Sequence, residues 1–267
     1  MRPSTRQAAR ETDPVDADRL RKYHSRRDSL GENGLGPLYY TIDEVPHRWN
    51  TRQEAVPLHG GRPIVDTRHW QHRTFTVGDV TVVGRLDWKA SAPRWANEVI
   101  YYNLAEKTLS QFITSIVVHH TNNDDGVREN ELKQKKRGYA ALGYHFFITK
   151  TGTVYEGRPL EVLGSHAGRG SIAGPLNDPD WGAVGIVLQG DYHNADNWFW
   201  QADTEAPSEQ LKVLKQLIVG VRDDYGVDRL LMHRDVTGRG GKPTVCPGDA
   251  MASEVERLRT ELGMSVR

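Results

Sequence analysis

The stretch Ile113-Thr114-Ser115-Ile116-Val117-Val118-His119-His120 has the pattern of a buried β-strand that ends in two histidines. β-Branched side chains dominate it, and such side chains favour extended backbone. A second run of the same character is Ala183-Val184-Gly185-Ile186-Val187-Leu188. Continuous apolar runs of this length are typical of strands that are covered on both faces. We therefore expect both segments to be central strands of a sheet.

The sequence around these two runs alternates between strand and helix patterns. A hairpin is predicted where a strand over residues 144–149 meets a glycine-containing turn and a return strand over residues 154–156. Apolar residues at helical spacing predict a helix that starts near Ser208. A short strand over residues 230–232 and a helix after Gly248 follow. Strands interleaved with helices predict an α/β fold, with a mixed central β-sheet flanked by helices.

Three segments of the chain differ in composition. Residues 1–36 are polar and charged, so we expect a flexible N-terminal segment. Residues 37–83 contain short pieces of alternating apolar residues, which predict a small β-rich or extended appendage. Together these two segments form an N-terminal extension whose structure the pattern does not define. Residues 84–267 carry the denser strand and helix patterns and are expected to form the main domain.

Composition excludes several classes of protein. The 267 residues include 35 Lys+Arg and 35 Asp+Glu, a balance that argues against a nucleic-acid partner. The single cysteine rules out an intrachain disulfide. The sequence has no apolar run of ~18 residues, so we expect no transmembrane segment. Its N-terminus also lacks the apolar core of a Sec signal peptide. We therefore expect synthesis in the cytoplasm, and release by lysis or a specialised route if the protein works elsewhere.

One cysteine and several histidines form a candidate metal site. Cys246 lies 13 positions after His233 (246 − 233), and the first predicted strand carries His119 and His120 at its end. Two imidazoles and one thiolate are a ligand set that Zn²⁺ favours, and three protein ligands leave a fourth position open for catalysis. The alternatives are structural histidines and a Cys246 that fills a small apolar space. Spacing alone does not choose between His119 and His120.

Eight short motifs follow one another between Arg85 and Gly248. They are Arg85-Leu86-Asp87-Trp88-Lys89-Ala90-Ser91-Ala92-Pro93, Val118-His119-His120-Thr121, Gly143-Tyr144-His145-Phe146, Gly152-Thr153-Val154-Tyr155-Glu156-Gly157-Arg158, Gly164-Ser165-His166-Ala167, Val184-Gly185-Ile186-Val187-Leu188-Gln189-Gly190-Asp191-Tyr192, His233-Arg234-Asp235-Val236 and Thr244-Val245-Cys246-Pro247-Gly248. In these motifs the chain resembles the zinc-dependent N-acetylmuramoyl-L-alanine amidases of type 2, in the branch of peptidoglycan recognition proteins and phage amidase-type lysozymes. The resemblance implies an amidase domain with a Zn²⁺ cofactor and peptidoglycan as its partner.

The resemblance also implies the metal ligands, which are His119, His233 and Cys246. His120 falls where the family varies, so it either packs in the protein or lines the substrate groove. Many recognition proteins that bind peptidoglycan without cutting it have lost the cysteine. Its presence here therefore favours catalysis over binding alone.

Two catalytic roles are implied in the same way. Tyr144 holds the position of a catalytic tyrosine, whose hydroxyl could hydrogen-bond the attacking water or the oxyanion. An unperturbed phenol pKa near ~10 argues against a free base at pH 7. Thr244 could donate a hydrogen bond to an oxyanion but supplies no charge. The alternatives are a core-facing strand residue for Tyr144 and a turn residue for Thr244.

The predicted substrate-binding set contains His166, His120, Arg158 and Asp235. His166 matches a groove histidine that contacts substrate in the family. Asp235 follows a metal ligand, so it could accept an imidazole N–H, or instead cap the chain or bridge a neighbouring arginine. The residue pair after Arg158, Pro159-Leu160, matches neither form that the family uses to distinguish stem peptides. The preference for diaminopimelate or lysine stems is left open.

These features predict hydrolysis of the amide bond between N-acetylmuramic acid and L-alanine. The alternatives are a non-catalytic peptidoglycan-binding module and a regulator that acts through its N-terminal segment. A phage endolysin, a wall-recycling enzyme and an antibacterial toxin delivered into rival bacteria could all carry this domain. A toxin would imply an immunity or delivery partner. In each setting we expect action on the cell wall, in the periplasm or outside the cell, after lysis or specialised release.

Overall fold

The computed structural model describes residues 58–59, 62–63, 70–93, 102, 108–167, 179–193, 203, 205–236 and 244–266. Within them lies a seven-stranded sheet with the strand order β3-β4-β7-β6-β8-β5-β9. A separate antiparallel pair joins β1 (Leu58–His59) to β2 (Arg62–Pro63). The other elements are β3 (Phe75–Val77), β4 (Val80–Val83), the 3₁₀ helix η2 (Leu109–Gln111), β5 (Ser115–His120), α3 (Val127–Lys136), β6 (Phe146–Ile148), β7 (Val154–Glu156), β8 (Ala183–Leu188), α4 (Ser208–Tyr225), β9 (Leu230–Met232), α5 (His233–Val236) and α6 (Asp249–Leu262).

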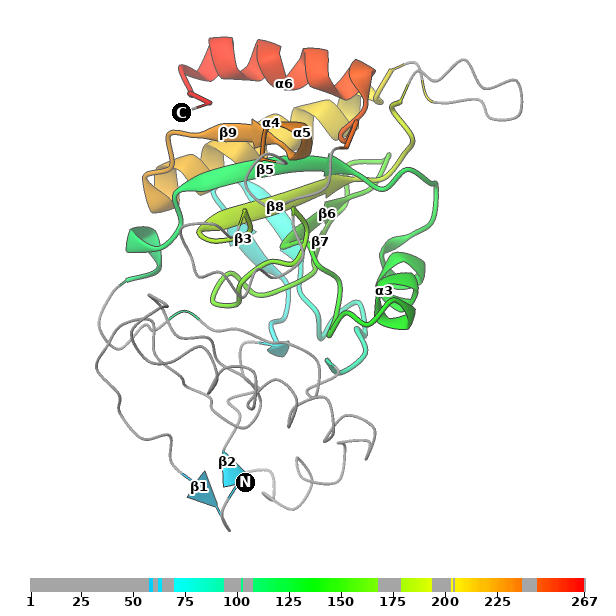
Figure 1. Cartoon of the computed structure of the whole chain (residues 1–267), viewed down its shortest axis with the longest axis vertical. Coiled ribbons are helices and arrows are strands. Elements are labelled where there is room, and N and C mark those ends of the chain that lie inside the picture. Colours follow the sequence, from blue (N-terminus) through cyan, green and yellow to red (C-terminus); the bar gives the residue numbers. More distant parts are fainter. Residues whose placement is uncertain are drawn as a thin grey trace.

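The large sheet is mixed. β5 pairs in parallel with both β8 and β9, and β6 pairs in parallel with β8. β7 runs antiparallel to β6, and β3 antiparallel to β4. Figure 1 shows α4 and α6 over one face of the sheet and α3 on the other side. The predicted fold class, α/β with a mixed central β-sheet flanked by helices, is confirmed.

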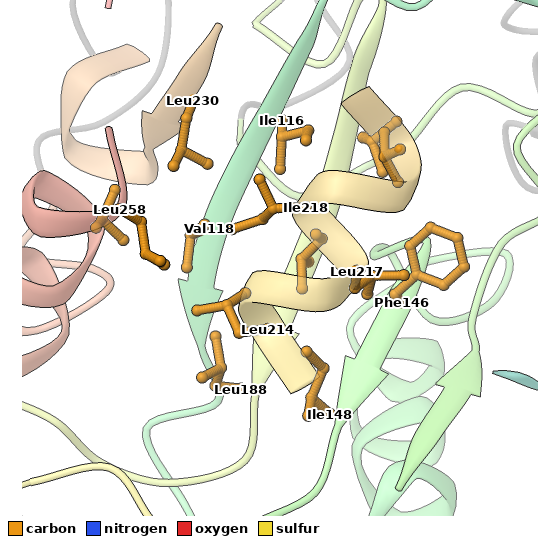
Figure 2. Packing of buried hydrophobic residues seen from close by; sticks show 14 of the residues in the cluster. Ile116, Val118, Phe146, Ile148, Leu188, Leu214, Leu217, Ile218, Leu230 and Leu258 are labelled. Atoms are coloured by element: carbon orange, nitrogen blue, oxygen red, sulfur yellow. The ribbon is translucent and has the colours of Figure 1, made fainter. Parts of the chain in front are cut away.

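The core on the α4 side follows from alternation along the strands. Ile116 and Val118 of β5 point toward α4, which presents Leu214, Leu217 and Ile218 at helical spacing (Figure 2). All five side chains are completely buried. Burying one side chain of this size contributes roughly 1.5–3 kcal/mol to folding. The core therefore holds β5 in place, and β5 carries two of the candidate site residues at its end.

The longest described helix, α4, has 18 residues and is amphipathic rather than apolar all round. Its polar face carries Glu209, Lys212 and Asp223, which are exposed. It ends at Gly226, whose φ of 70° lies in the left-handed region that favours glycine. In the described part of the chain, no helix is long and apolar enough to cross a membrane.

The predicted domain boundary at residue 84 is wrong. β3 and β4 form a hairpin, and β4 joins the large sheet by parallel pairing with β7. Val77, Val80 and Val82 of this hairpin are buried in the main core. Part of the predicted appendage over residues 37–83 is therefore an edge of the main domain. The predicted flexible segment 1–36 and most of residues 37–69 lie outside the described residues.

A buried ion pair fastens the segment after β4 to α3. Arg85 and Glu131 are each 1% exposed, and the Arg85 Nη2 donates to the Glu131 Oε1 over 2.7 Å. The same guanidinium donates to the carbonyl oxygens of Gly157 and Ser91 and lies 5.3 Å from the centroid of the Trp88 ring. These contacts offset the cost of removing a charge from water.

Replacing Arg85 by methionine is expected to lower the free energy of unfolding by about 3–5 kcal/mol, because the Glu131 carboxylate then stays buried without its partner. The matched control is Arg257→Met on α6, whose pair with Glu261 is exposed. That substitution should change stability little, because exposed pairs are screened by solvent. Urea unfolding followed by circular dichroism measures both variants. Equal losses in the two would show that the buried pair has no special role.

Candidate metal centre and active site

Strand alternation separates the two histidines at the end of β5, since successive side chains of a strand point to opposite faces. His120 faces the α4 side, where it is buried and its Nδ1 accepts the backbone N–H of Tyr192 over 3.1 Å. Its side chain therefore packs inside the protein, and a substrate contact by His120 stays a prediction. His119 faces the other side, and its Nδ1 lies 3.7 Å from the Sγ of Cys246. The structure thus brings the imidazole of His119, not that of His120, to the cysteine.

Three side chains from separate elements converge on this face. His119 comes from β5, His233 is the first residue of α5 directly after β9, and Cys246 precedes α6. Their donor atoms all lie within 4.8 Å of one another. In a tetrahedral zinc site with usual bond lengths, a nitrogen and a sulfur ligand are about 3.6 Å apart. The 3.7 Å between His119 Nδ1 and Cys246 Sγ matches that spacing. The residues therefore fit one Zn²⁺ ion held by three protein ligands.

Burial sets the protonation of the three side chains. Desolvation lowers the pKa of His119 well below its ordinary value, and it lowers the pKa of His233 as well. Both imidazoles are therefore neutral at pH 7, the form that binds a metal. Desolvation raises the pKa of the Cys246 thiol to about 12, so the metal-free cysteine is protonated. Metal uptake must displace this proton.

The loop that carries Cys246 is fixed by its neighbours. The Thr244 Oγ1 accepts the backbone N–H of Cys246 over 3.1 Å, and the Cys246 carbonyl accepts the N–H of Arg234 over 3.0 Å. Gly248 has a φ of 91°, and a Cβ at this residue would lie 2.3 Å from the Tyr192 carbonyl. The predicted residue Thr244 therefore supports the cysteine, and its hydroxyl proton can still be donated to another acceptor.

Tyr144 lies beside the candidate ligand His119, with 5.0 Å between their ring centroids. Burial raises the pKa of the Tyr144 phenol, so the hydroxyl stays protonated and is a hydrogen-bond donor at neutral pH. Its backbone carbonyl accepts the N–H of Arg158 over 2.8 Å, and the preceding Gly143 N–H donates to the Gln134 side chain. The strand predicted from residue 144 begins two residues later, so Tyr144 sits in the segment that enters β6.

His166, for which we predicted a substrate contact, has partners inside the protein. Its side chain is completely buried, and its Nδ1 lies 2.9 Å from the Nε2 of His119. The carboxylate of Asp180 accepts the backbone N–H groups of His166 and Ala167 over 2.9 and 2.8 Å. His166 therefore contacts a candidate metal ligand from inside the protein.

Two further predicted substrate residues also have structural partners. Arg158 is buried, and its guanidinium donates to the carbonyl oxygens of Leu142 and Leu163. It therefore ties together the segments around Tyr144. Asp235 accepts the backbone N–H of Met232 and pairs with the guanidinium of Arg259 on α6. Asp235 thus caps α5, and Arg259, rather than the predicted neighbouring arginine or an imidazole, is its charged partner.

A comparison with protein families settles where the chain belongs. The family model described as N-acetylmuramoyl-L-alanine amidase (Amidase_2) matches residues 109–249, slightly more than half of the 267 residues. The chain belongs to this amidase family. The resemblance drawn from the eight motifs is therefore confirmed. The matched range includes all three candidate metal ligands and Tyr144.

Individual relatives of this family member are both animal and viral. Peptidoglycan-recognition protein SD of Drosophila simulans is 27% identical over 185 residues, 67% of this chain and 87% of the relative. The endolysin of Enterobacteria phage K11 is 30% identical over 139 residues, 52% of this chain and 80% of the relative. A solved structure, N-acetylmuramoyl-L-alanine amidase LysC from Clostridium intestinale URNW, has a TM-score of 0.46 at 27% identity and covers 59% of this chain and 90% of that chain. Family membership supports a function in peptidoglycan hydrolysis or recognition.

Sequence reasoning missed the residues that hold this amidase site together. Asp180 fixes the backbone beside His166, and Gln134 on α3 fixes the segment before Tyr144. Asp180 is one of 35 acidic residues, and no pattern around it indicates burial. A local signal exists for Gly143, because glycines often mark places where backbones approach closely. A Cβ on Gly143 would lie 2.2 Å from the Ser165 carbonyl oxygen.

Proposed function

We propose that this chain is a zinc-dependent hydrolase that cleaves the amide bond between the lactyl group of N-acetylmuramic acid and L-alanine in peptidoglycan. One observation carries the proposal. The donor atoms of His119, His233 and Cys246 converge within 4.8 Å in a member of the amidase family. Recognition of peptidoglycan alone requires no metal site with an open fourth position. The complete ligand set therefore favours hydrolysis over binding.

The residues around the three ligands suit amide hydrolysis. A Zn²⁺ ion held there would supply Lewis-acid activation of a water molecule and of the scissile carbonyl group. The hydroxyl of Tyr144, next to His119, would donate a hydrogen bond to the substrate oxygen that gains negative charge. Thr244 would be a second donor, placed by its own bond to the Cys246 N–H. The Cys246 thiolate would lower the net charge of the metal centre.

Peptidoglycan as the substrate is supported by the names of the relatives, which include an endolysin and a peptidoglycan-recognition protein. The bond is the one that the family's description names. We place the action at the cell wall, since that is where this polymer lies. Release by lysis or a specialised route, and any immunity or delivery partner, stay predictions.

Digestion of two purified peptidoglycans, one with diaminopimelate stems and one with lysine stems, tests the proposal. Mass spectrometry should detect free stem peptides that begin with L-alanine, together with glycan strands that keep their lactyl groups. Two stem types are needed because Pro159-Leu160 leaves the preference open. A chelator should stop the release, and added Zn²⁺ should restore it. Binding without any released stem would make the chain a recognition protein, and release that persists in chelator would refute the zinc requirement.

A further inference from the structure

His166 is a buried imidazole beside the metal centre that the proposed chemistry does not use. We propose that His166 is a positioning residue, which accepts the Nε2–H of His119 and so fixes the ring whose Nδ1 faces the metal. The inference rests on the metal site of the proposed function, but it does not depend on peptidoglycan hydrolysis. It concerns how the chain prepares one ligand before the metal arrives.

Two distances identify the proton arrangement of His119. Its Nδ1 lies 3.7 Å from the Cys246 Sγ, and its Nε2 lies 2.9 Å from the His166 Nδ1. A ligand nitrogen must offer a lone pair, so Nδ1 carries no proton and the neutral ring is protonated on Nε2. This Nε2–H donates to the Nδ1 of His166. The proton of His166 is then on its own Nε2, which lies 3.4 Å from the Ala183 carbonyl oxygen. In this arrangement each ring donates once, and the His166 Nδ1 accepts from His119 although the Asp180 Oδ1 also lies 3.2 Å from that nitrogen.

A closely fitted slot keeps His166 in this orientation. A Cβ on Gly185 would lie 2.3 Å from the His166 Cδ2, and a Cβ on Gly164 would lie 2.5 Å from the same atom. The two glycines therefore leave the space that the ring occupies. The backbone of His166 is held by the buried Asp180 carboxylate over 2.9 Å. Because the ring cannot move aside, two glycines set the direction of its hydrogen bond to His119. They are Gly185 in β8 and Gly164, two residues before His166.

We expect the hydrogen bond from His119 to His166 to raise the affinity of the site for the metal. A histidine ligand that loses the partner of its second nitrogen typically binds metal 10- to 100-fold more weakly, because its ring and tautomer are no longer fixed. His233 has such a partner too, in a hydrogen bond to the backbone of Ala167. For His119 the partner is a neutral side chain, so it can be exchanged without altering the backbone.

Two substitutions of equal shape separate hydrogen bonding from packing. His166→Asn places a carbonyl oxygen near the position of the lost Nδ1, whereas His166→Leu has the same branching and no acceptor. Competition between the apo-protein and a chromophoric chelator gives Zn²⁺ affinity. We expect about 10- to 100-fold weaker binding for His166→Leu and an affinity close to wild type for His166→Asn. The visible absorption of the Co²⁺-loaded protein should shift in the leucine variant, since it reports ligand geometry.

His145→Leu is the matched control. His145 is also a buried histidine, but its ring hydrogen-bonds to the backbone of Gly185 and Val162 rather than to a ligand. Thermal unfolding of each apo-protein measures the general loss of stability. Equal loss of Zn²⁺ affinity in His145→Leu and His166→Leu, or in the asparagine and leucine variants of His166, would overturn the proposal.

Nitrogen-15 NMR of the unsubstituted apo-protein gives a test that needs no variant. The ring of His119 should be in the Nε2–H tautomer before metal is added, and an Nδ1–H tautomer would overturn the proposal. Affinity and tautomer are both measured without peptidoglycan. A failure of the amidase assay with these results intact would therefore refute the proposed hydrolysis and leave the role of His166 standing.

Discussion

The Cys246→Ser variant is expected to release stem peptides at least about 10³-fold more slowly than the wild type. A metal centre contributes several kcal/mol of transition-state stabilisation, and each 1.36 kcal/mol corresponds to a factor of ten in rate. A serine hydroxyl is not ionised at neutral pH and is a poor ligand for zinc, which favours a soft thiolate. The variant keeps the size of the side chain, so the fold should be retained.

Two measurements on Cys246→Ser separate loss of metal from loss of structure. Elemental analysis should find much less zinc per chain, and circular dichroism should show an unchanged fold. Val245→Ala is the control, because Val245 is next to the cysteine and is 50% exposed. It should keep both zinc and activity. Wild-type rates in a serine variant that lacks zinc would contradict a metal-dependent reaction.

Local pattern predicted strands and helices well here, but it could not predict how distant strands pair. The apolar runs of β5 and β8 follow from burial on both faces, which selects continuous apolar residues. The hairpin of β3 and β4 has the expected alternation too. Its place in the large sheet depends on pairing between Val82 and Val154, 72 positions apart (154 − 82). No periodicity within either segment specifies that partner, so the boundary at residue 84 was misplaced.

The candidate site shows the same limit of local sequence pattern. His119, His233 and Cys246 were identified by residue type and by their places in motifs at or after strands, and these are the residues whose donor atoms converge. His166 and Arg158 also lie in motifs, yet both are buried and bond to other parts of the site. A motif includes residues that build a site as well as those that touch a substrate. Only the packing of several segments distinguishes the two roles.

Replacing Tyr144 by phenylalanine is expected to lower kcat by about 10²- to 10³-fold, the usual cost of removing one donor to an oxyanion. The ring packs against His119 with 5.0 Å between centroids, and phenylalanine preserves that contact. Zinc content should therefore be unchanged, and KM should change much less than kcat. This pattern would distinguish a hydroxyl that acts in the transition state from one that merely helps to bind substrate.

The matched control for Tyr144→Phe is Tyr155→Phe on β7, whose ring packs on Trp88 and forms no ring pair with His119 or His233 in the described part of the chain. That variant should keep kcat close to the wild-type value, because it removes a hydroxyl outside the site. Stem-peptide release from one purified peptidoglycan, measured with zinc in excess, compares the two variants directly. A Tyr144→Phe variant with wild-type kcat would show that Tyr144 only packs against its ligand. The proposed donor to the oxyanion would then be Thr244, whose hydroxyl oxygen accepts the backbone N–H of Cys246.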